Sequence, residues 1–285
     1  MKLSAYHKQQ GDIVEWYQPF TEKYDRVYIS KIFSFSPDYE YVINANEVIR
    51  GGTGYEIKTI NNREIYSPLL TLPFEIEHTY PDYDLYGVYD TAYGFLTRGC
   101  PRGCDFCVVT KKEGCKSIKV ADINEFWSGQ KNIVLCDANI LACPEWRDLF
   151  DQLAETKSYI DFNQGLDIRL MTQEKAEYIS RCKIKEIHFA WDRYEDKELI
   201  VKKLQLFAEK APKRHGHRGI VYTIVNFNTS FEQDLERIYT LREMEYWPYV
   251  MIYNKKQCDN KYKRLQRWVN NRIIFSKCER FEDYK

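Results

Sequence analysis

The sequence has no excess of either charge, because 42 Lys and Arg residues balance 42 Asp and Glu residues among 285 positions. Proteins that bind long nucleic acids without sequence preference usually carry a basic excess, so we expect no tight nonspecific binding to nucleic acid. The chain also lacks a run of about 18 apolar residues, the length that a membrane-spanning helix needs. Its first residues do not combine a basic segment with an apolar one, as a secretory signal would. These absences predict a cytoplasmic protein with no membrane partner.

An even framework of cysteines is missing as well. Three of the nine cysteines fall within eight residues, and the other six are scattered. A small secreted protein held by disulfides would show an even set of cysteines in a short chain. The pattern instead indicates a reducing compartment and a metal site.

Two parts of the chain differ in pattern. In residues 1–88, the apolar segments 26–33 and 40–44 are predicted strands separated by turns that contain glycine or proline. Residues 76–89, rich in Tyr and Asp and without a regular period, are expected to connect this part to the rest. We therefore predict a small amino-terminal α/β lobe at 1–88 and a second domain at 89–285.

Short apolar runs alternate with helical patterns in the second domain. The predicted strands are 94–97, 132–136, 159–162, 186–190, 219–225 and 249–253. Capping boxes that begin at Asp122 and Ser230, and a capping Thr172, support helices between these strands. Parallel strands joined by helices predict an α/β fold, here a partial (β/α)6 barrel, whose chemistry sits at the carboxyl ends of its strands.

Three cysteines lie in the loop that follows the first of these strands. Cys100, Cys104 and Cys107 have the spacing C-x3-C-x2-C, with glycine and proline between them. Thiolates are soft ligands that hold iron–sulfur clusters, and three of them leave the fourth iron of a 4Fe-4S cluster open. The alternative is a zinc site that Cys115 closes, because structural zinc usually has four ligands.

Polar side chains follow the other predicted strands, although a barrel strand without a functional site ends in apolar residues. The candidates are Asp137, Asn139, Gln164, Asp167, Arg169, Asp192, Asn226 and Asn228. Helix capping alone would explain Asn139 and Asn228, because asparagine satisfies free backbone N–H groups where a helix begins. Capping does not require Gln or Arg, so Gln164 and Arg169 are better explained by ligand binding, and Arg169 suits a carboxylate.

Two further features stay open from the residues alone. His188 lies within a predicted strand and faces either the barrel interior or the helices; we expect a structurally satisfied histidine. The basic segment 255–272 forms either a solvated helix face, which we favour, or a contact for a phosphate group.

The segment from Thr97 to Cys107, with Phe106 just before its last cysteine, resembles the signature of the radical S-adenosylmethionine superfamily. The resemblance covers about residues 93–253. It implies a 4Fe-4S cluster whose open iron binds S-adenosylmethionine and whose electron cleaves that cofactor to a 5′-deoxyadenosyl radical. It also implies an electron donor such as flavodoxin or ferredoxin, and a partial barrel as the core.

The same resemblance assigns roles to individual residues. It places Phe106 near the adenine, and it implies that S-adenosylmethionine contacts the strand-end residues Asp137, Asn139, Gln164, Asp167, Arg169, Asp192 and Asn226. The Gly-Gly-Glu that the superfamily usually carries after the second strand is absent, so Asp137 is a substitute for it. No catalytic residue is assigned.

The amino-terminal lobe resembles the start of cobalamin-binding domains, but the motif Asp-x-His-x-x-Gly is not intact: Ala5 stands in place of the Asp, and Gly11 lies four residues after His7. We expect a degenerate lobe without cobalamin. The reduced lobe and the segments 137–141, 162–170, 267–270 and 281–284 resemble queuine lyases. That family releases queuine from queuosine 5′-phosphate, a small nucleotide, in queuine salvage.

Two alternatives to a queuine lyase remain. One is a radical S-adenosylmethionine enzyme that modifies tRNA, like the methylthiotransferases; the balanced charge and the lack of a recognisable RNA-binding domain argue against it. The other is a zinc-stabilised binding module, which would contain no iron.

Overall fold

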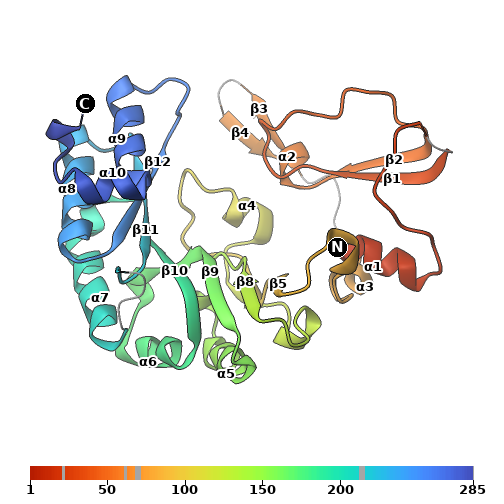
Figure 1. Cartoon of the computed structure of the whole chain (residues 1–285), viewed down its shortest axis with the longest axis horizontal. Helices are drawn as coiled ribbons and strands as arrows, with labels where there is room; N and C mark the ends of the chain where they lie inside the picture. The colour runs from red at the N-terminus through yellow and green to blue at the C-terminus, as the bar shows by residue number, and fades with distance from the viewer. Residues whose placement is uncertain (21–22, 61–62, 68–71, 212–215, 285) are drawn as a thin grey trace. The chain divides into compact units, whose positions relative to one another are not determined.

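A computed structural model of the protein describes residues 1–20, 23–60, 63–67, 72–211 and 216–284. The chain divides into two compact units (Figure 1). The first comprises Met1–Tyr89 and Arg102–Cys115, and the second comprises Asp90–Pro101 and Lys116–Lys285. The chain therefore returns from the second unit to the first within the cysteine loop, after Pro101.

Among its described residues, the first unit contains two separate pairs of strands and four short helices. Strands β1 (Tyr24–Ser30) and β2 (Ala45–Gly51) pair in parallel, and β3 (Ile57–Ile60) and β4 (Arg63–Tyr66) form an antiparallel pair. The helices are α1 (Lys2–Gln9), α2 (Thr53–Glu56), α3 (Phe74–Glu77) and α4 (Val109–Glu113), with the 3₁₀ helix η1 (Asp84–Tyr86). This is a small α/β arrangement.

One strand predicted for this unit is correct in place and the other is wrong. The segment 26–33 corresponds to β1, but 40–44 forms no strand, and pairing with β1 begins at Ala45. Tyr41 and Val42 are exposed. Strand preference depends on packing against a half-buried surface, which these two side chains do not have.

His7, the residue compared with the histidine of cobalamin-binding domains, is used inside the first unit. Its Nδ1 lies 2.6 Å from Asp12 Oδ2, and its Nε2 lies 2.8 Å from the hydroxyl of Tyr28. Both ring nitrogens are therefore engaged by protein groups, and the histidine ties α1 to β1.

The second unit is built on a six-stranded parallel sheet in the order β12-β11-β10-β9-β8-β5. Its strands are β5 (Thr91–Gly94), β8 (Asn132–Leu135), β9 (Tyr159–Leu166), β10 (Lys183–Ala190), β11 (Ile220–Val225) and β12 (Trp247–Ile252). The predicted α/β class with parallel strands is confirmed. The first predicted strand, 94–97, is misplaced, because β5 ends at Gly94 and the separate strand β6 (Thr97–Arg98) pairs antiparallel with β7 (Ile118–Lys119).

Helices connect the strands of the sheet, and two more follow its last strand. They are α5 (Trp146–Thr156), α6 (Gln173–Arg181), α7 (Lys197–Lys210), α8 (Phe231–Glu243), α9 (Asn260–Asn270) and α10 (Arg272–Lys277). The 3₁₀ helices are η2 (Ile123–Glu125), η3 (Ile140–Ala142), η4 (Ile168–Leu170), η5 (Tyr194–Asp196) and η6 (Phe281–Asp283). The caps predicted at Asp122, Thr172 and Ser230 are confirmed. Within the described ranges no helix is long and apolar enough to span a membrane.

The two faces of the sheet differ in what covers them. Parallel connections are almost always right-handed, so a sheet whose strands follow one another in chain order has its connecting helices on one face, as Figure 1 shows for α5 to α8. Phe162 of β9 stacks on Phe150 of α5, and Phe189 of β10 packs against Phe207 of α7. We call the opposite face the inner face; it carries Tyr93, Val134, Asp161, Glu186, His188, Tyr222 and Tyr249.

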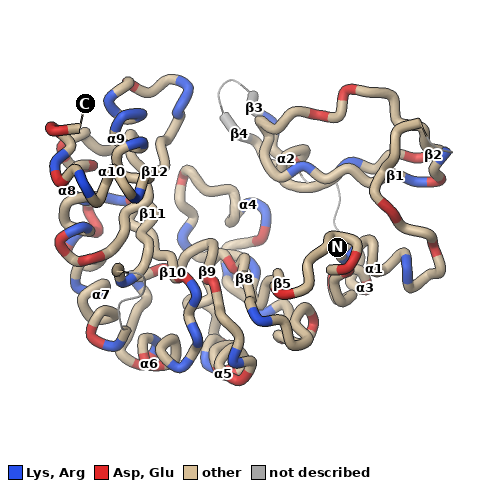
Figure 2. The backbone as a smooth tube through the Cα atoms, viewed as in Figure 1, with Lys and Arg blue, Asp and Glu red and all other residues tan. Residues whose placement is uncertain are grey.

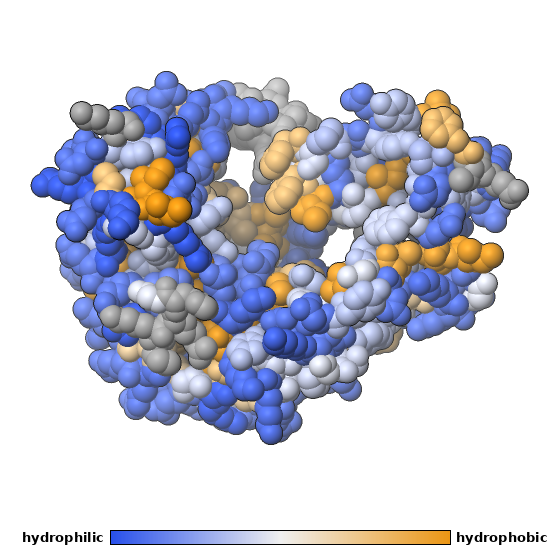
Figure 3. Space-filling model, viewed as in Figure 1, coloured by the Kyte–Doolittle hydropathy of each residue, from blue (hydrophilic) through white to orange (hydrophobic). Residues whose placement is uncertain are grey.

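Charged residues are spread over both units, whereas apolar side chains gather at certain places on the surface of the first unit. Figure 2 shows Lys and Arg interspersed with Asp and Glu along both units. Figure 3 shows apolar side chains gathered at several places on the visible surface of the first unit. Exposed apolar side chains of that unit include Ile13, Phe20, Phe35 and Val42.

A buried ion pair lies beneath the carboxyl ends of β10 and β11. The guanidinium of Arg237 on α8 is fully buried beside the carboxylate of Asp234. It also donates hydrogen bonds to the carbonyls of Trp191, Asp192 and Ile224, at 2.6, 3.1 and 2.7 Å. Because the cation satisfies backbone groups of two strand ends, it fixes those ends to α8.

Replacing Arg237 with alanine should lower the free energy of unfolding by about 3–5 kcal/mol, because the Asp234 carboxylate would stay buried without its cation. Urea unfolding followed by circular dichroism measures the change. The matched control is Arg181→Ala, which breaks a surface pair with Asp151 and should have an effect below about 1 kcal/mol. Equal effects of the two substitutions would contradict this account of the strand ends.

Candidate functional site

Asp137, two residues after the end of β8, holds the backbone that leads into the cysteine loop. Its Oδ1 accepts hydrogen bonds from the backbone N–H of Leu96 at 3.1 Å and from the hydroxyl of Thr97 at 2.7 Å, and it also accepts from the N–H of Thr97. The side chain is buried, and this burial outweighs the donors and raises the pKa of Asp137 to about 6. Asp137 therefore holds the backbone at Leu96 and Thr97, and the cysteine loop begins at Cys100, three residues after Thr97.

Asn139 links the end of β8 to the first cysteine of the loop. Its Nδ2 lies 3.5 Å from the Sγ of Cys100 and 3.4 Å from Asp167 Oδ2. The residue is 1% exposed, and its Oδ1 is buried without a hydrogen-bond partner among the described residues. Although Asn139 precedes η3, its side chain makes no capping bond in the part of the chain that the structure describes. Capping therefore does not explain this asparagine.

Asp167 and Arg169 extend this chain of polar contacts along the edge of the sheet. Arg169 Nε donates to Asp167 Oδ1 at 2.8 Å, and Arg169 Nη1 donates to Asp196 Oδ2 at 3.1 Å. Burial alone would lower the pKa of Arg169, but the two carboxylates raise it, so the guanidinium is firmly cationic. Asp167 also caps η4 by accepting from the backbone N–H of Arg169. A continuous series of contacts thus runs from Cys100 through Asn139, Asp167 and Arg169 to Asp196.

Asp192 lies next to this series, just beyond the end of β10. Its Oδ1 accepts a weak hydrogen bond from the N–H of Ile224 at 3.4 Å. Burial raises the pKa of Asp192 to about 6, although Arg237 and Arg169 act in the opposite direction. The carboxyl edge of the sheet therefore contains two carboxyl groups, those of Asp137 and Asp192, whose protonation changes near pH 6.

Three of the predicted residues lie apart from this series. Gln164 is exposed near the end of β9. Asn226 donates from Nδ2 to the carbonyl of Tyr253 at 3.1 Å and so ties the ends of β11 and β12. Asn228 does not cap α8, because Ser230 does so. Gln164 and Asn228 are exposed, so their polar side chains are accessible to a ligand.

The cysteine loop is divided between the units. Cys100 belongs to the second unit, whereas Cys104, Phe106 and Cys107 belong to the first, where the N–H of Cys107 donates to the carbonyl of Cys104 at 2.9 Å. All three cysteines are half-buried thiols. Gly99 and Gly103 adopt φ values of 86° and 59°, which favour glycine and let the chain turn sharply on both sides of Cys100.

The residues of the loop fit an iron–sulfur cluster by their chemistry. Three soft thiol donors within eight residues, flanked by glycines, match what such a cluster requires. Across the described residues, however, His, Cys, Asp and Glu side chains form no group of three that is arranged to hold a metal ion. Cys115, which a closed zinc site would use, is exposed in the first unit.

Other cysteines are poor candidates for ligands. Burial raises the pKa of Cys136 and of Cys143 to about 11 and that of Cys182 to about 12. The thiolate is the form that binds metals, so these buried thiols remain protonated and inert at neutral pH.

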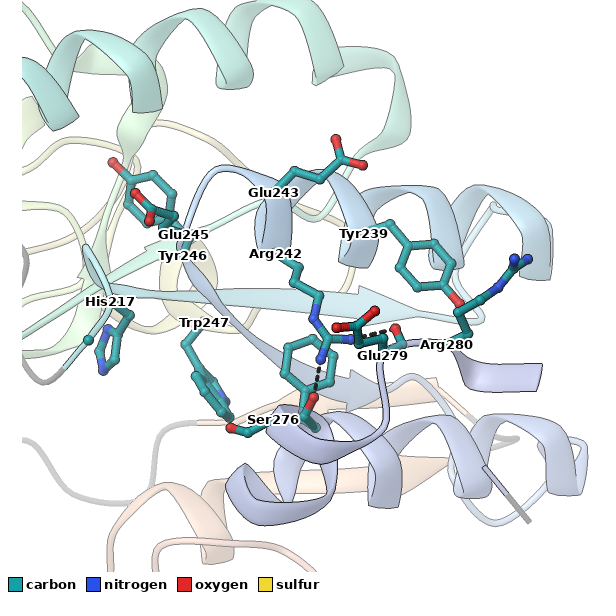
Figure 4. Close-up of a pocket in the computed structure, with 12 residues that line it drawn as sticks. His217, Tyr239, Arg242, Glu243, Glu245, Tyr246, Trp247, Ser276, Glu279 and Arg280 are labelled. Carbon is teal, nitrogen blue, oxygen red and sulfur yellow. Dashed lines mark hydrogen bonds between the residues drawn. The ribbon is translucent and has the colours of Figure 1, made fainter. Parts of the chain in front are cut away.

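A cavity of about 750 Å³ lies elsewhere in the second unit, beside His217, Arg242, Trp247 and Phe275 (Figure 4). Trp247 is the first residue of β12, so the cavity opens at the amino ends of the strands, whereas ligands of parallel sheets bind at the carboxyl ends. The guanidinium of Arg242 is committed to the carbonyls of Phe275, Cys278 and Glu279 at the end of α10. We do not assign this cavity to the functional site.

Sequence reasoning missed Asp196 and the role of Asp137. Asp196 precedes α7, where an aspartate has a helix-capping explanation, and it meets Arg169 from 27 positions away. Asp137 was expected to contact the cofactor, but its carboxylate is occupied by Leu96 and Thr97. No local pattern reveals contacts between segments so far apart in the chain.

The pH dependence of stability tests the burial of Asp137. Its pKa is about 6 in the folded chain against 3.8 for a solvated aspartate. The folded state therefore binds this proton more tightly, and the free energy of unfolding should fall by about 2–3 kcal/mol as the pH rises from 4 to 7. Asp137→Asn should lose this component in urea titrations at successive pH values. Glu174→Gln is a control for a carboxyl group whose pKa is shifted in the opposite direction, because Arg147 lowers the pKa of Glu174. Parallel pH curves of the unfolding free energy for wild type and Asp137→Asn would contradict the assignment.

No protein-family model matches the chain, and no curated protein matches its sequence. The function is therefore inferred from the cysteine loop, from the polar series at the carboxyl edge of the sheet and from the inner face.

Proposed function

We propose that the protein is a cytoplasmic radical S-adenosylmethionine enzyme that holds a 4Fe-4S cluster on Cys100, Cys104 and Cys107. The observation that carries the proposal is the C-x3-C-x2-C loop, which follows the edge strand β5 of a parallel sheet and starts beside a polar series at the carboxyl ends of the strands. When bound, the cluster supplies the electron that cleaves S-adenosylmethionine, after reduction by a donor such as flavodoxin or ferredoxin.

The sheet supports this proposal through its order and its covering. Six parallel strands in chain order, with their connecting helices on one face, are what a partial (β/α)6 barrel requires. We take the inner face as the interior of such a barrel. The cofactor would then bind at the carboxyl edge, and the substrate would lie against the inner face.

The chain's own residues have distinct tasks in this proposal. Asp137 fixes the entry to the loop, and Asn139 donates an N–H toward the sulfur of Cys100, an interaction that tunes a cluster ligand. Arg169, held by Asp167 and Asp196, presents a rigid cation to the carboxylate of S-adenosylmethionine. Gln164 and Asp192 are the remaining polar groups that would contact the cofactor, and Phe106 would pack on its adenine.

As the substrate we propose queuosine 5′-phosphate, from which the enzyme would release queuine. The segments 137–141 and 162–170, which resemble queuine lyases, supply Asn139, Asp167 and Arg169 of the polar series and the last residues of β9. The balanced charge suits a small nucleotide better than a tRNA, whose many phosphates require a basic surface. The phosphate would meet basic side chains of the segment 255–272.

The substrate assay incubates reconstituted protein, reductant and S-adenosylmethionine with queuosine 5′-phosphate. We expect free queuine together with 5′-deoxyadenosine, and slower turnover with the dephosphorylated nucleoside because binding energy from the phosphate helps to position the reacting ribose. Formation of a modified base from tRNA, with no queuine from the nucleotide, would overturn the lyase proposal.

The Arg169→Ala variant should bind S-adenosylmethionine about ten- to a hundredfold more weakly, since it loses a charge-assisted contact.

A further inference from the structure

The inner face of the sheet carries a stack of aromatic rings beside a carboxylate. His188 of β10 and Tyr222 of β11 are stacked, with ring centroids 5.1 Å apart and planes inclined by 9°. Tyr249 of β12 meets Tyr222 edge to face at 5.8 Å and is exposed. Asp161 of β9 lies on the same face, next to His188. Strand register therefore places a row of three aromatic rings, which we call the platform, beside a carboxylate.

The hydrogen-bond donors of His188 and Tyr222 are already used by the backbone. His188 Nδ1 lies 3.1 Å from the carbonyl of Phe162, so in the neutral ring the proton sits on Nδ1 and Nε2 is an acceptor. The hydroxyl of Tyr222 donates to the carbonyl of Asn163 at 2.9 Å. His188 and Tyr222 therefore offer a ligand acceptors only.

Asp161 is the strongest of these acceptors. Its Oδ1 is buried and has no hydrogen-bond partner among the described residues. The distance from Oδ1 to His188 Nδ1 is 3.6 Å, too long for a hydrogen bond, and that nitrogen faces the carbonyl of Phe162. The side chain still keeps 17% of its surface exposed. A buried carboxylate without a donor is unfavourable for stability, which points to a role in binding.

The backbone next to the platform is irregular, and β9 approaches β10 and Tyr222 closely there. Gly165, near the end of β9, has a φ of 91°, and a Cβ there would lie 3.6 Å from both the carbonyl oxygen of His188 and the ring of Tyr222. The register between β9 and β10 shifts between Ile187 and Phe189. Irregular backbone of this kind often accompanies binding sites.

We propose that Asp161 recognises the donor edge of a purine-like base that packs on the accessible rings of this platform, those of Tyr222 and Tyr249. A base with adjacent ring N–H and exocyclic amino groups, as in guanine and 7-deazaguanine, supplies two donors to one carboxylate. The Asp161 carboxylate matches that edge and disfavours bases that present acceptors there. The inference rests on the proposed function for the identity of the substrate, and it adds the residue that selects its base.

Binding of two nucleotides to the reconstituted full chain, with S-adenosylmethionine and without reductant, tests this. Guanosine 5′-phosphate and inosine 5′-phosphate differ only in the exocyclic amino group. Isothermal titration calorimetry should show that the wild type binds the guanosine nucleotide about ten- to a hundredfold more tightly. Asp161→Asn should abolish this preference while the melting temperature stays the same or rises, because the variant removes an unpartnered buried charge.

Glu186→Gln is the matched control. Glu186 is the register partner of Asp161 on the same face, but it is paired with Arg272 at 3.2 Å, so its substitution should leave the preference intact. A wild type without preference for the guanosine nucleotide, or an Asp161→Asn variant that keeps the preference and melts at a lower temperature, would overturn the inference. The assay involves no turnover, so a failed lyase assay with an intact base preference would sink the proposed reaction and leave the base site standing.

Discussion

A buried carboxylate, that of Asp137, fixes the start of the cysteine loop, and the rest of the candidate site depends on it. This carboxylate, just beyond the end of β8, accepts hydrogen bonds from the backbone N–H groups of Leu96 and Thr97, which follow β5. Two residues further on, Asn139 reaches the sulfur of Cys100 and the carboxylate of Asp167. The short segment 137–139 thus contacts both the backbone that precedes the loop and the sulfur of its first cysteine. Burial raises the pKa of Asp137 to about 6, so the arrangement is maintained at the expense of stability at neutral pH.

The second unit separates two kinds of chemistry on one sheet. At the carboxyl edge, Arg169 is held between Asp167 and Asp196 and provides a fixed cation. On the inner face, Asp161 provides a carboxylate with no hydrogen-bond partner in the described ranges. A fixed cation suits an anionic group of a cofactor, whereas a carboxylate beside stacked rings suits the donors of a base. Perturbed carboxyl groups concentrated in one unit are typical of functional sites, and burial also raises the pKa of Asp161.

Much of the fold could be predicted from the sequence, because local patterns determine it. The alternation of apolar runs and helices predicted the parallel sheet, and the caps at Thr172 and Ser230 are where the side chains predicted them. The first strand was misplaced because the apolar run continues past Gly94, where contact with Asp137 draws the chain out of the sheet. The direction of His188 could not be predicted, since the register shift in β10 breaks the alternation along the strand. The contacts of Arg169 and Asn139 join segments about thirty residues apart, and no spacing rule reports them.

The most direct test of the central claim is the iron and acid-labile sulfide content of anaerobically reconstituted protein. We predict about four iron atoms per chain in the wild type. The same content is expected in the control variant Cys115→Ser. Almost no iron should remain in Cys100→Ala, Cys104→Ala and Cys107→Ala, each of which should keep the circular dichroism spectrum of the cofactor-free chain. Full iron retention in Cys104→Ala, or one zinc ion per chain that is lost with Cys115→Ser, would contradict the account.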